Sequence, residues 1–230
     1  MAKPLILIVD DDIAMIKFIS ANLKAREYDV ILASNGEDAL LEVEQNIVDL
    51  IILDFMIPVI DGLEVCRRIR EWSQVPIIML SAKGDEEAKV KCLNTGADDY
   101  ITKPFGIAEL LARVQAAFRH HNSSKAAPLQ TVTSLGELEV NFAKRCVSVK
   151  GDSVRLTPIE YSLLHQLMLN RNKVMTYNML LQKVWGEHYY NEKEYVHVFI
   201  GRLRNKIERD PKNPKYIVTV PGVGYYINSG

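Results

Sequence analysis

Long apolar runs are absent from this sequence, and cysteine is scarce. No stretch approaches the roughly 20 apolar residues that a helix needs to cross a bilayer, and Met1-Ala2-Lys3 leads into a strand-like segment without signal-peptide architecture. Cys66, Cys92 and Cys146 are too widely spaced for a zinc motif or a redox pair. We therefore expect a cytoplasmic protein with no membrane partner, in which each cysteine is a small packing residue.

An excess of either charge is also missing, since the net charge is −1. The two halves differ, however: residues 1–121 hold 13 Lys and Arg against 20 Asp and Glu (−7), and residues 122–230 hold 15 against 9 (+6). This asymmetry predicts two domains with different partners, the basic one being the candidate for nucleic acid. We expect a first domain over 1–121, a linker over 122–131, where small polar residues replace any periodicity, and a second domain over 132–230.

The first half alternates apolar segments of strand length with amphipathic segments. Such alternation predicts an α/β fold, a flavodoxin-like (βα)5 doubly wound parallel sheet. Right-handed crossovers then place the carboxyl ends of all strands at one edge. The expected strands are Leu5–Val9, Val30–Ala33, Leu50–Leu53, Ile77–Leu80 and Tyr100–Ile101, and the expected helices are 13–25, 36–46, 62–72, 85–95 and 106–119.

Polar side chains follow four of these strands: Asp10-Asp11-Asp12, Asp54, Ser81 and Lys103-Pro104. Clustered carboxylates repel one another unless a cation joins them, and all-oxygen ligands suit Mg²⁺. Asp54 is then the candidate nucleophile toward a phosphoryl group, with Lys103 and Ser81 as phosphate ligands. Asp12 alone is interpreted as the N-cap of the first helix.

Residues 3–119 resemble a response-regulator receiver domain, in Val9-Asp10-Asp11, Leu53–Pro58, Ser81-Ala82, Gly96–Tyr100 and Lys103-Pro104-Phe105. The resemblance implies that a sensor histidine kinase phosphorylates Asp54. It implies that Asp10, Asp11, Asp54 and the Met56 backbone carbonyl hold Mg²⁺, and that Ser81 and Tyr100 form a switch pair. It also implies a homodimer on phosphorylation, through Lys89 with Glu109 and Asp99 with Arg113 around an apolar centre of Leu93 and Leu111.

The second half reads as short strands, three helices and a terminal hairpin, which predicts a winged helix-turn-helix α+β domain. In the third helix, Val196, Ile200, Leu203 and Ile207 form the core-facing stripe. His197, Gly201, Arg204, Asn205 and Glu208 are expected on the opposite face, with Arg202 and Lys206 at its flanks. The expected strands are Leu135–Phe142, Arg145–Val149, Val154–Leu156, Tyr216–Val220 and Tyr225–Ile227, and the helices begin at Thr157-Pro158, Tyr177 and Lys193 and end near 168, 184 and 209.

Residues 132–228 resemble the winged-helix output domain of the OmpR/PhoB family, in Leu156–Tyr161, Trp185-Gly186, Arg202-Leu203-Arg204 and Val223-Gly224-Tyr225. The resemblance implies double-stranded promoter DNA as a partner, with Arg202 and Arg204 as DNA contacts and Thr219 and Tyr225 at phosphates. Trp185 and Glu187 open the loop that meets RNA polymerase in that family, and Trp185 is a second candidate for a phosphate contact.

This sequence departs from the family pattern at the third helix and the wing. Glu194–Phe199 replaces the usual Arg-x-Val-Asp-Val-His, Gly201 replaces an arginine, and Pro221 stands where many relatives have arginine. Base readout is therefore assigned to His197, Arg202 and Asn205. Tyr195, Phe199-Ile200-Gly201 and Pro221–Tyr225 are similar to the KdpE-like branch.

The favoured interpretation is a response regulator in which phosphorylation of Asp54 promotes dimerisation and sequence-specific DNA binding. It is not an enzyme beyond its own phosphoryl transfer. A Mg²⁺-dependent phosphohydrolase similar to the haloacid dehalogenase superfamily would need a second acid two residues after the nucleophile, where Met56 stands. A DNA binder independent of phosphorylation is the third interpretation.

Overall fold

The computed structural model describes residues 3–82, 86–122, 132–189 and 192–228. Contacts divide the chain into two compact units, Met1–Phe118 and Arg119–Gly230. The linker expected over 122–131 lies outside the described residues except at its first position, so the bounds 1–121 and 132–230 stay predictions. Among the described residues, no helix combines the length and the apolar character needed to cross a bilayer.

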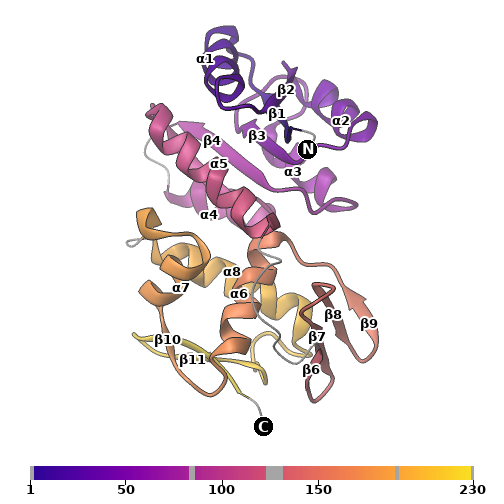
Figure 1. Cartoon of the computed structure of the whole chain (residues 1–230), viewed down its shortest axis with the longest axis vertical. Helices are drawn as coiled ribbons and strands as arrows, with labels where there is room; N and C mark the ends of the chain where they lie inside the picture. Colours follow the sequence, from indigo (N-terminus) through magenta and orange to yellow (C-terminus); the bar gives the residue numbers. More distant parts are fainter. Residues whose placement is uncertain (1–2, 83–85, 123–131, 190–191, 229–230) are drawn as a thin grey trace. The chain divides into compact units, whose positions relative to one another are not determined.

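The first unit is a parallel five-stranded sheet with helices on both faces (Figure 1). The strand order is β2-β1-β3-β4-β5, and every neighbouring pair is parallel, which confirms the predicted doubly wound fold. Runs of Val, Ile and Leu form these strands because both of their faces are covered, and β3 is buried at every residue. The elements are β1 (Leu5–Val9), α1 (Ile13–Lys24), β2 (Asp29–Ala33), α2 (Gly36–Gln45), β3 (Leu50–Asp54), α3 (Gly62–Arg70), β4 (Ile77–Ala82), α4 (Glu86–Thr95), β5 (Asp99–Lys103) and α5 (Ile107–Asn122).

Two apolar clusters hold the helices against this sheet. On one face, α1 and α5 contribute residues such as Ile19 and Leu110, and on the other α2, α3 and α4 contribute residues such as Val43, Cys66 and Cys92. Helix starts follow their caps: Asp12 Oδ1 accepts from the N–H groups of the residues two and three positions on, as predicted. The layers leave the carboxyl ends of β1, β3, β4 and β5 together at one edge.

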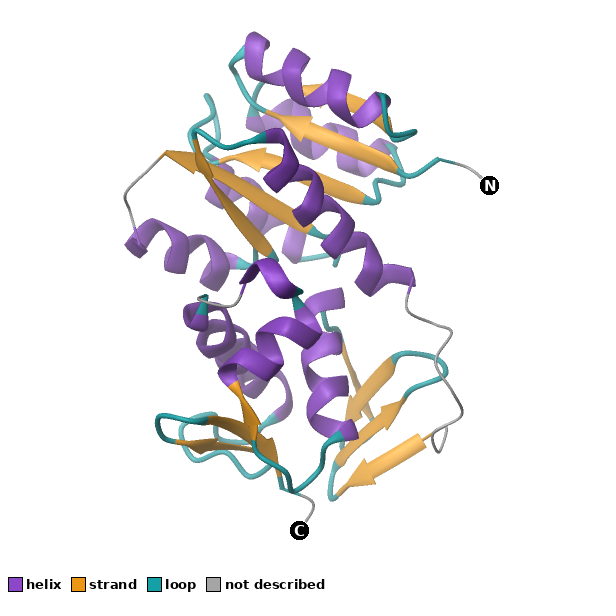
Figure 2. Ribbon diagram, turned by 60° about the vertical axis from the view of Figure 1, so that its left-hand side comes forward, coloured by secondary structure: helices purple, strands orange, loops and turns teal. Residues whose placement is uncertain are grey.

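The second unit combines two antiparallel sheets with three helices and a short 3₁₀ turn (Figure 2). One sheet has the order β6-β7-β8-β9, and the other has the order β10-β12-β11. The elements are β6 (Val132–Leu135), β7 (Leu138–Asn141), β8 (Cys146–Val149), β9 (Asp152–Val154), α6 (Pro158–Leu169), β10 (Met175–Thr176), α7 (Tyr177–Val184), η1 (Glu187–Tyr189), α8 (Lys193–Ile207), β11 (Ile217–Val220) and β12 (Gly224–Ile227). The predicted winged helix-turn-helix is confirmed.

Three expectations for this unit are wrong in detail. The strand expected over Leu135–Phe142 starts too early: Leu135 ends β6 and β7 begins at Leu138, because the chain turns at Gly136, whose φ of 56° is left-handed. The short strand β10 was not expected; it pairs with β12 where a Cβ on Gly224 would lie 2.0 Å from the Met175 carbonyl oxygen. Cys146 is exposed rather than packed in the core, whereas Cys66 and Cys92 are buried as expected.

Candidate functional site

Three aspartates lie together at the carboxyl edge of the first unit's sheet. Asp10 follows β1 and Asp54 ends β3, and both are buried, while Asp11 is exposed. One ligand oxygen from each lies within 4.8 Å of the others. β1 and β3 are neighbouring parallel strands, which is why residues 44 positions apart meet. This all-oxygen donor set fits a hard divalent cation such as Mg²⁺.

Lys103 completes this acidic site from the end of β5. Its Nζ lies 2.7 Å from Asp10 Oδ2 and 2.8 Å from Asp54 Oδ1. Burial raises the pKa of Asp54, and the hydrogen bond and charge of Lys103 offset this only in part. Burial by itself lowers the pKa of Lys103, but its bonds to Asp10 and Asp54 outweigh this and raise it. The lysine therefore stays cationic beside the carboxylate that the sequence singled out. Its peptide bond to Pro104 is cis.

The proposed switch residues are both buried. Ser81 lies at the end of β4, one position beyond Leu80, which pairs with Asp54 in the sheet register. Tyr100 on β5 is 5% exposed and belongs to the core cluster on the side of α2, α3 and α4. In this conformation the tyrosine ring is therefore already inside. The Met56 side chain is 71% exposed in the loop after β3.

The residues expected at a dimer face divide into two kinds. Arg113 forms ion pairs within its own chain, at 2.9 Å to Asp99 and 2.9 Å to Glu109. Leu93 and Leu111 are buried in this conformation, at 0% and 6% exposure. Their place at the centre of a dimer face stays a prediction. The predicted Lys89 lies on α4, half-buried.

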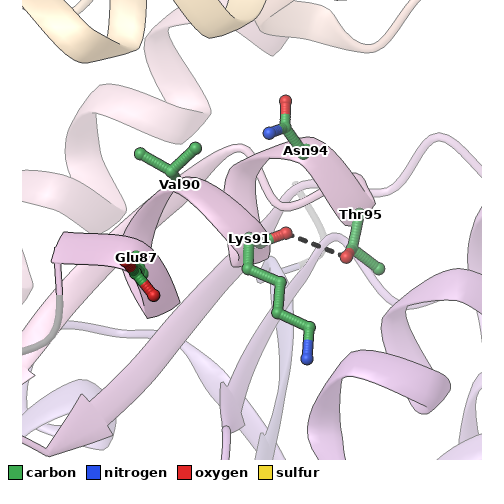
Figure 3. A pocket seen from close by; sticks show the side chains of 5 residues that line it. All are labelled: Glu87, Val90, Lys91, Asn94 and Thr95. Carbon is green, nitrogen blue, oxygen red and sulfur yellow. Dashed lines mark hydrogen bonds between the residues drawn. The ribbon is translucent and has the colours of Figure 1, made fainter.

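Figure 3 shows a pocket on α4 lined by Glu87, Val90, Lys91, Asn94 and Thr95, in which the Thr95 hydroxyl donates to the Lys91 carbonyl oxygen at 2.9 Å.

In the second unit, α8 buries its apolar stripe as predicted. Val196, Ile200, Leu203 and Ile207 are at most 1% exposed. Glu208, expected on the exposed face, is instead buried: its carboxylate accepts the backbone N–H groups of Lys215, Tyr216 and Ile217, each at 2.8 Å. The residue after α8 therefore anchors the start of strand β11.

Four of the six predicted DNA contacts gather between α8 and the wing strands. The Tyr225 hydroxyl lies 2.7 Å from His197 Nδ1. Arg204 Nη2 donates to the Thr219 hydroxyl at 2.8 Å and to the Ile217 carbonyl oxygen at 2.6 Å. Desolvation by burial lowers the pKa of Arg204, yet it carries no carboxylate partner within ion-pair distance among the described residues. The cluster thus couples the helix to the wing and keeps a cation near the surface.

The other two predicted DNA contacts lie apart from this cluster. Asn205 is exposed on α8. Arg202 turns toward α6, where its Nη2 lies 2.8 Å from Oε1 of Glu160, a carboxylate with no exposed surface. Sequence reasoning identified Glu160 only as an acid in the first turn of α6, and missed this contact; the spacing of the Thr157–Glu160 capping box signals the cap but not the ion pair.

The loop after α7 differs from the expectation at its first residue. Trp185 is 2% exposed and packs edge-on against Tyr195 and Phe199. A side chain so enclosed offers almost no surface to a phosphate in this conformation, and the role of the loop that Trp185 opens stays a prediction. Glu187 is exposed on η1. Tyr177, which the sequence did not single out, packs against His197 with ring centroids 4.9 Å apart.

Comparison with known proteins agrees with both halves of this arrangement. The family model of the response regulator receiver domain matches residues 6–115, and that of the transcriptional regulatory protein C terminal matches residues 151–227. Response regulator DrrB of Thermotoga maritima, an OmpR/PhoB homologue, is 32% identical over 98% of this chain and 99% of its own, with a TM-score of 0.53.

Two further solved structures match. A cysteine-to-serine mutant of RitR is 30% identical over 99% of this chain and 100% of its own, with a TM-score of 0.79. The receiver domain of Francisella response regulator 1452 is 35% identical over 52% of this chain and 100% of its own, with a TM-score of 0.51. The match with DrrB spans nearly the whole of both chains. The chain therefore belongs to the OmpR/PhoB family of response regulators.

Proposed function

We propose that this transcription regulator is switched by phosphorylation of Asp54, and that a sensor histidine kinase is the phosphodonor. The observation that carries the proposal is the position of the Asp54 carboxylate, 2.8 Å from Lys103 Nζ and within 4.8 Å of the Asp10 and Asp11 oxygens. In the reaction, a carboxylate oxygen forms a bond to phosphorus as the P–N bond of phosphohistidine breaks, and the released imidazole takes a proton.

The residues around Asp54 divide the work of this transfer. Lys103 places a positive charge where the phosphoryl oxygens arrive, and the Ser81 hydroxyl is the hydrogen-bond donor for one of them. Asp10, Asp11, Asp54 and the Met56 carbonyl are the proposed Mg²⁺ ligands, and the ion, when bound, neutralises phosphoryl charge. The three clustered carboxylate oxygens support this assignment. Ser81 and Tyr100 are the proposed switch pair.

Activation is proposed to act through dimerisation of the first unit. Arg113 pairs with Asp99 and Glu109 within its own chain. Exchanging these pairs between two copies related by a two-fold axis would leave every charge with a partner of opposite sign. A dimer brings two basic second units onto neighbouring half-sites, and the effective concentration raises their joint affinity for DNA. Leu93 and Leu111 take part only if α4 and α5 repack on activation.

DNA recognition is assigned to α8 in the major groove with the wing beside it. His197 and Asn205 are exposed on α8 and are the proposed base readers, while Arg204, Thr219 and Tyr225 hold the phosphates. The exposed Glu187 on η1 is the proposed contact for RNA polymerase. Tyr195 and the wing sequence Pro221–Tyr225 support a place in the KdpE-like branch, whose members control potassium uptake. Measuring whether the transcripts that this protein regulates respond to external potassium tests this assignment.

Phosphorylation and assembly are tested together by light scattering with Mg²⁺, before and after addition of beryllium fluoride. The wild-type chain is expected to pass from monomer to dimer, and the variant D54N is expected to stay monomeric. Incubation with acetyl phosphate, followed by mass spectrometry, separates the two steps: one added phosphoryl group without a change of molar mass refutes activation by dimerisation. No added group in the wild-type chain refutes phosphorylation at Asp54.

A further inference from the structure

The strongest unexplained feature is the fully buried carboxylate of Glu160 in the first turn of α6. Its Oε2 accepts the Thr157 backbone N–H at 2.9 Å, closing the capping box, and lies 2.6 Å from Lys206 Nζ. Its Oε1 lies 2.8 Å from Arg202 Nη2. A buried carboxylate is costly unless cations and hydrogen-bond donors compensate it. Both of its cationic partners come from α8, which packs beside α6 (Figure 1).

Arg202 and Lys206 are four residues apart, so they lie one turn apart on the same flank of α8. The Arg202 side chain is 11% exposed, and its guanidinium lies 4.5 Å from the centroid of the Phe199 ring. Lys206 also donates to the Arg155 carbonyl oxygen at 3.0 Å. These contacts hold both cations on the α6 side of the helix. Moving Arg202 to a DNA phosphate would remove one of the two charges that compensate Glu160.

Arg204, two residues further along, is held differently. Its donors reach only neutral oxygens, those of Ile217 and Thr219, and Thr219 is exposed on the wing. Its ring contact is with Tyr225, at 5.6 Å from the centroid. Among the described residues Arg204 has no carboxylate within ion-pair distance, and the charge of Glu208 acts on it only from further away. Arg202, by contrast, is ion-paired to Glu160. The two arginines of the Arg202-Leu203-Arg204 motif thus have different electrostatic surroundings.

We propose that Glu160 is a positioning residue: it withdraws Arg202 and Lys206 from DNA and fixes α8 against α6, so that Arg204 supplies the phosphate contact of the Arg202-Leu203-Arg204 motif. This inference rests on the proposed DNA-binding role of α8. It assigns the motif's two arginines to different tasks, one inside the protein and one at the groove.

The matched pair R202M and R204M tests the proposal in the full-length chain. Binding to a fluorescein-labelled duplex of arbitrary sequence is measured by anisotropy between about 50 and 200 mM NaCl, because each neutralised phosphate contributes about 0.9 to the slope of log K against log salt. R204M is expected to lower the magnitude of the slope by about 0.9, and R202M is expected to leave it at the wild-type value. R202M is also expected to lower the urea midpoint of the second unit, since Glu160 loses a partner.

A slope lowered by about 0.9 in R202M as well would overturn the proposal, because Arg202 would then be a phosphate contact. If the wild-type chain does not bind the duplex at low salt, the proposed DNA-binding role itself fails, which is a distinct result. If R202M does not fold, the charge-balanced double variant E160Q/R202M takes its place, since a glutamine at 160 still accepts from Thr157 and Lys206. The same wild-type slope is expected for it, and a lowered slope again refutes the proposal.

Discussion

Glu208 offers a sharp test of how the recognition helix is joined to the wing. Replacing Glu208 by alanine leaves the N–H groups of Lys215, Tyr216 and Ile217 without their acceptor. Tyr216 and Ile217 are buried, and each unsatisfied buried donor costs about 1–3 kcal/mol. Lys215 is exposed, so water replaces most of its lost bond. Removing a negative charge from the C-terminus of α8 returns about 0.3–1 kcal/mol. The expected loss of unfolding free energy is therefore about 3 kcal/mol.

Glutamine at position 208 is the matched control. One side-chain oxygen accepts from both Tyr216 and Ile217 in the wild-type chain, and the amide oxygen of glutamine can keep both bonds. Only the bond from the exposed Lys215 to the other oxygen is lost, and water replaces most of it, so E208Q is expected to lose at most about 1 kcal/mol.

The assay is urea unfolding followed by tryptophan fluorescence. The chain has two tryptophans, Trp72 in the first unit and Trp185 in the second, so a W72F background makes the signal report the second unit alone. The midpoint should fall while the slope with denaturant stays constant. Equal losses in E208A and E208Q, or a loss in E208A below about 1 kcal/mol, would refute the assigned role of the carboxylate.

Three further predictions concern the first unit. Val59 has a φ of 72°, a conformation that strains the backbone of a β-branched residue. V59G is therefore expected to raise the free energy of unfolding by about 1 kcal/mol in urea titration. An unchanged free energy of unfolding would show that the backbone at Val59 is not strained. Burial raises the pKa of Asp54, so the folded chain binds that proton more tightly than the unfolded chain and stability falls as pH rises through the folded pKa. D54N should therefore raise the thermal midpoint at pH 7 but not below about pH 4, and equal gains at both would contradict this. The Arg70 guanidinium lies 2.7 Å from the buried Asp98 carboxylate and donates to the Gly96 carbonyl oxygen at 2.9 Å. R70M should therefore lower the free energy of unfolding by about 3 kcal/mol in calorimetry. A loss below about 1 kcal/mol would show that other groups compensate the charge of Asp98.

Local chemistry in the sequence determined most of the architecture. Apolar runs such as Leu50–Leu53 predicted buried strands, Asp12 and Thr157 predicted the helix starts, and Tyr177–Val184 was placed at the bounds that the structure has. The juxtaposition of Asp10, Asp54 and Lys103 was also predictable, because strand order and right-handed crossovers place strand ends at one edge. These inferences succeed because periodicity, capping and crossover handedness act over short or topologically fixed distances.

Only the tertiary structure decided which polar side chains of the second unit face solvent. A helical wheel places Glu208 opposite the buried stripe and Arg202 at its flank, but it does not show what packs against each side of α8. The carboxylate of Glu160 on α6 forms an ion pair with Arg202, and backbone N–H groups at the start of β11 donate hydrogen bonds to Glu208. Likewise Trp185 is enclosed by rings from α8 rather than by its own neighbours in sequence. Burial of a polar or aromatic group depends on partners distant in the chain, and a single sequence carries no record of those pairings.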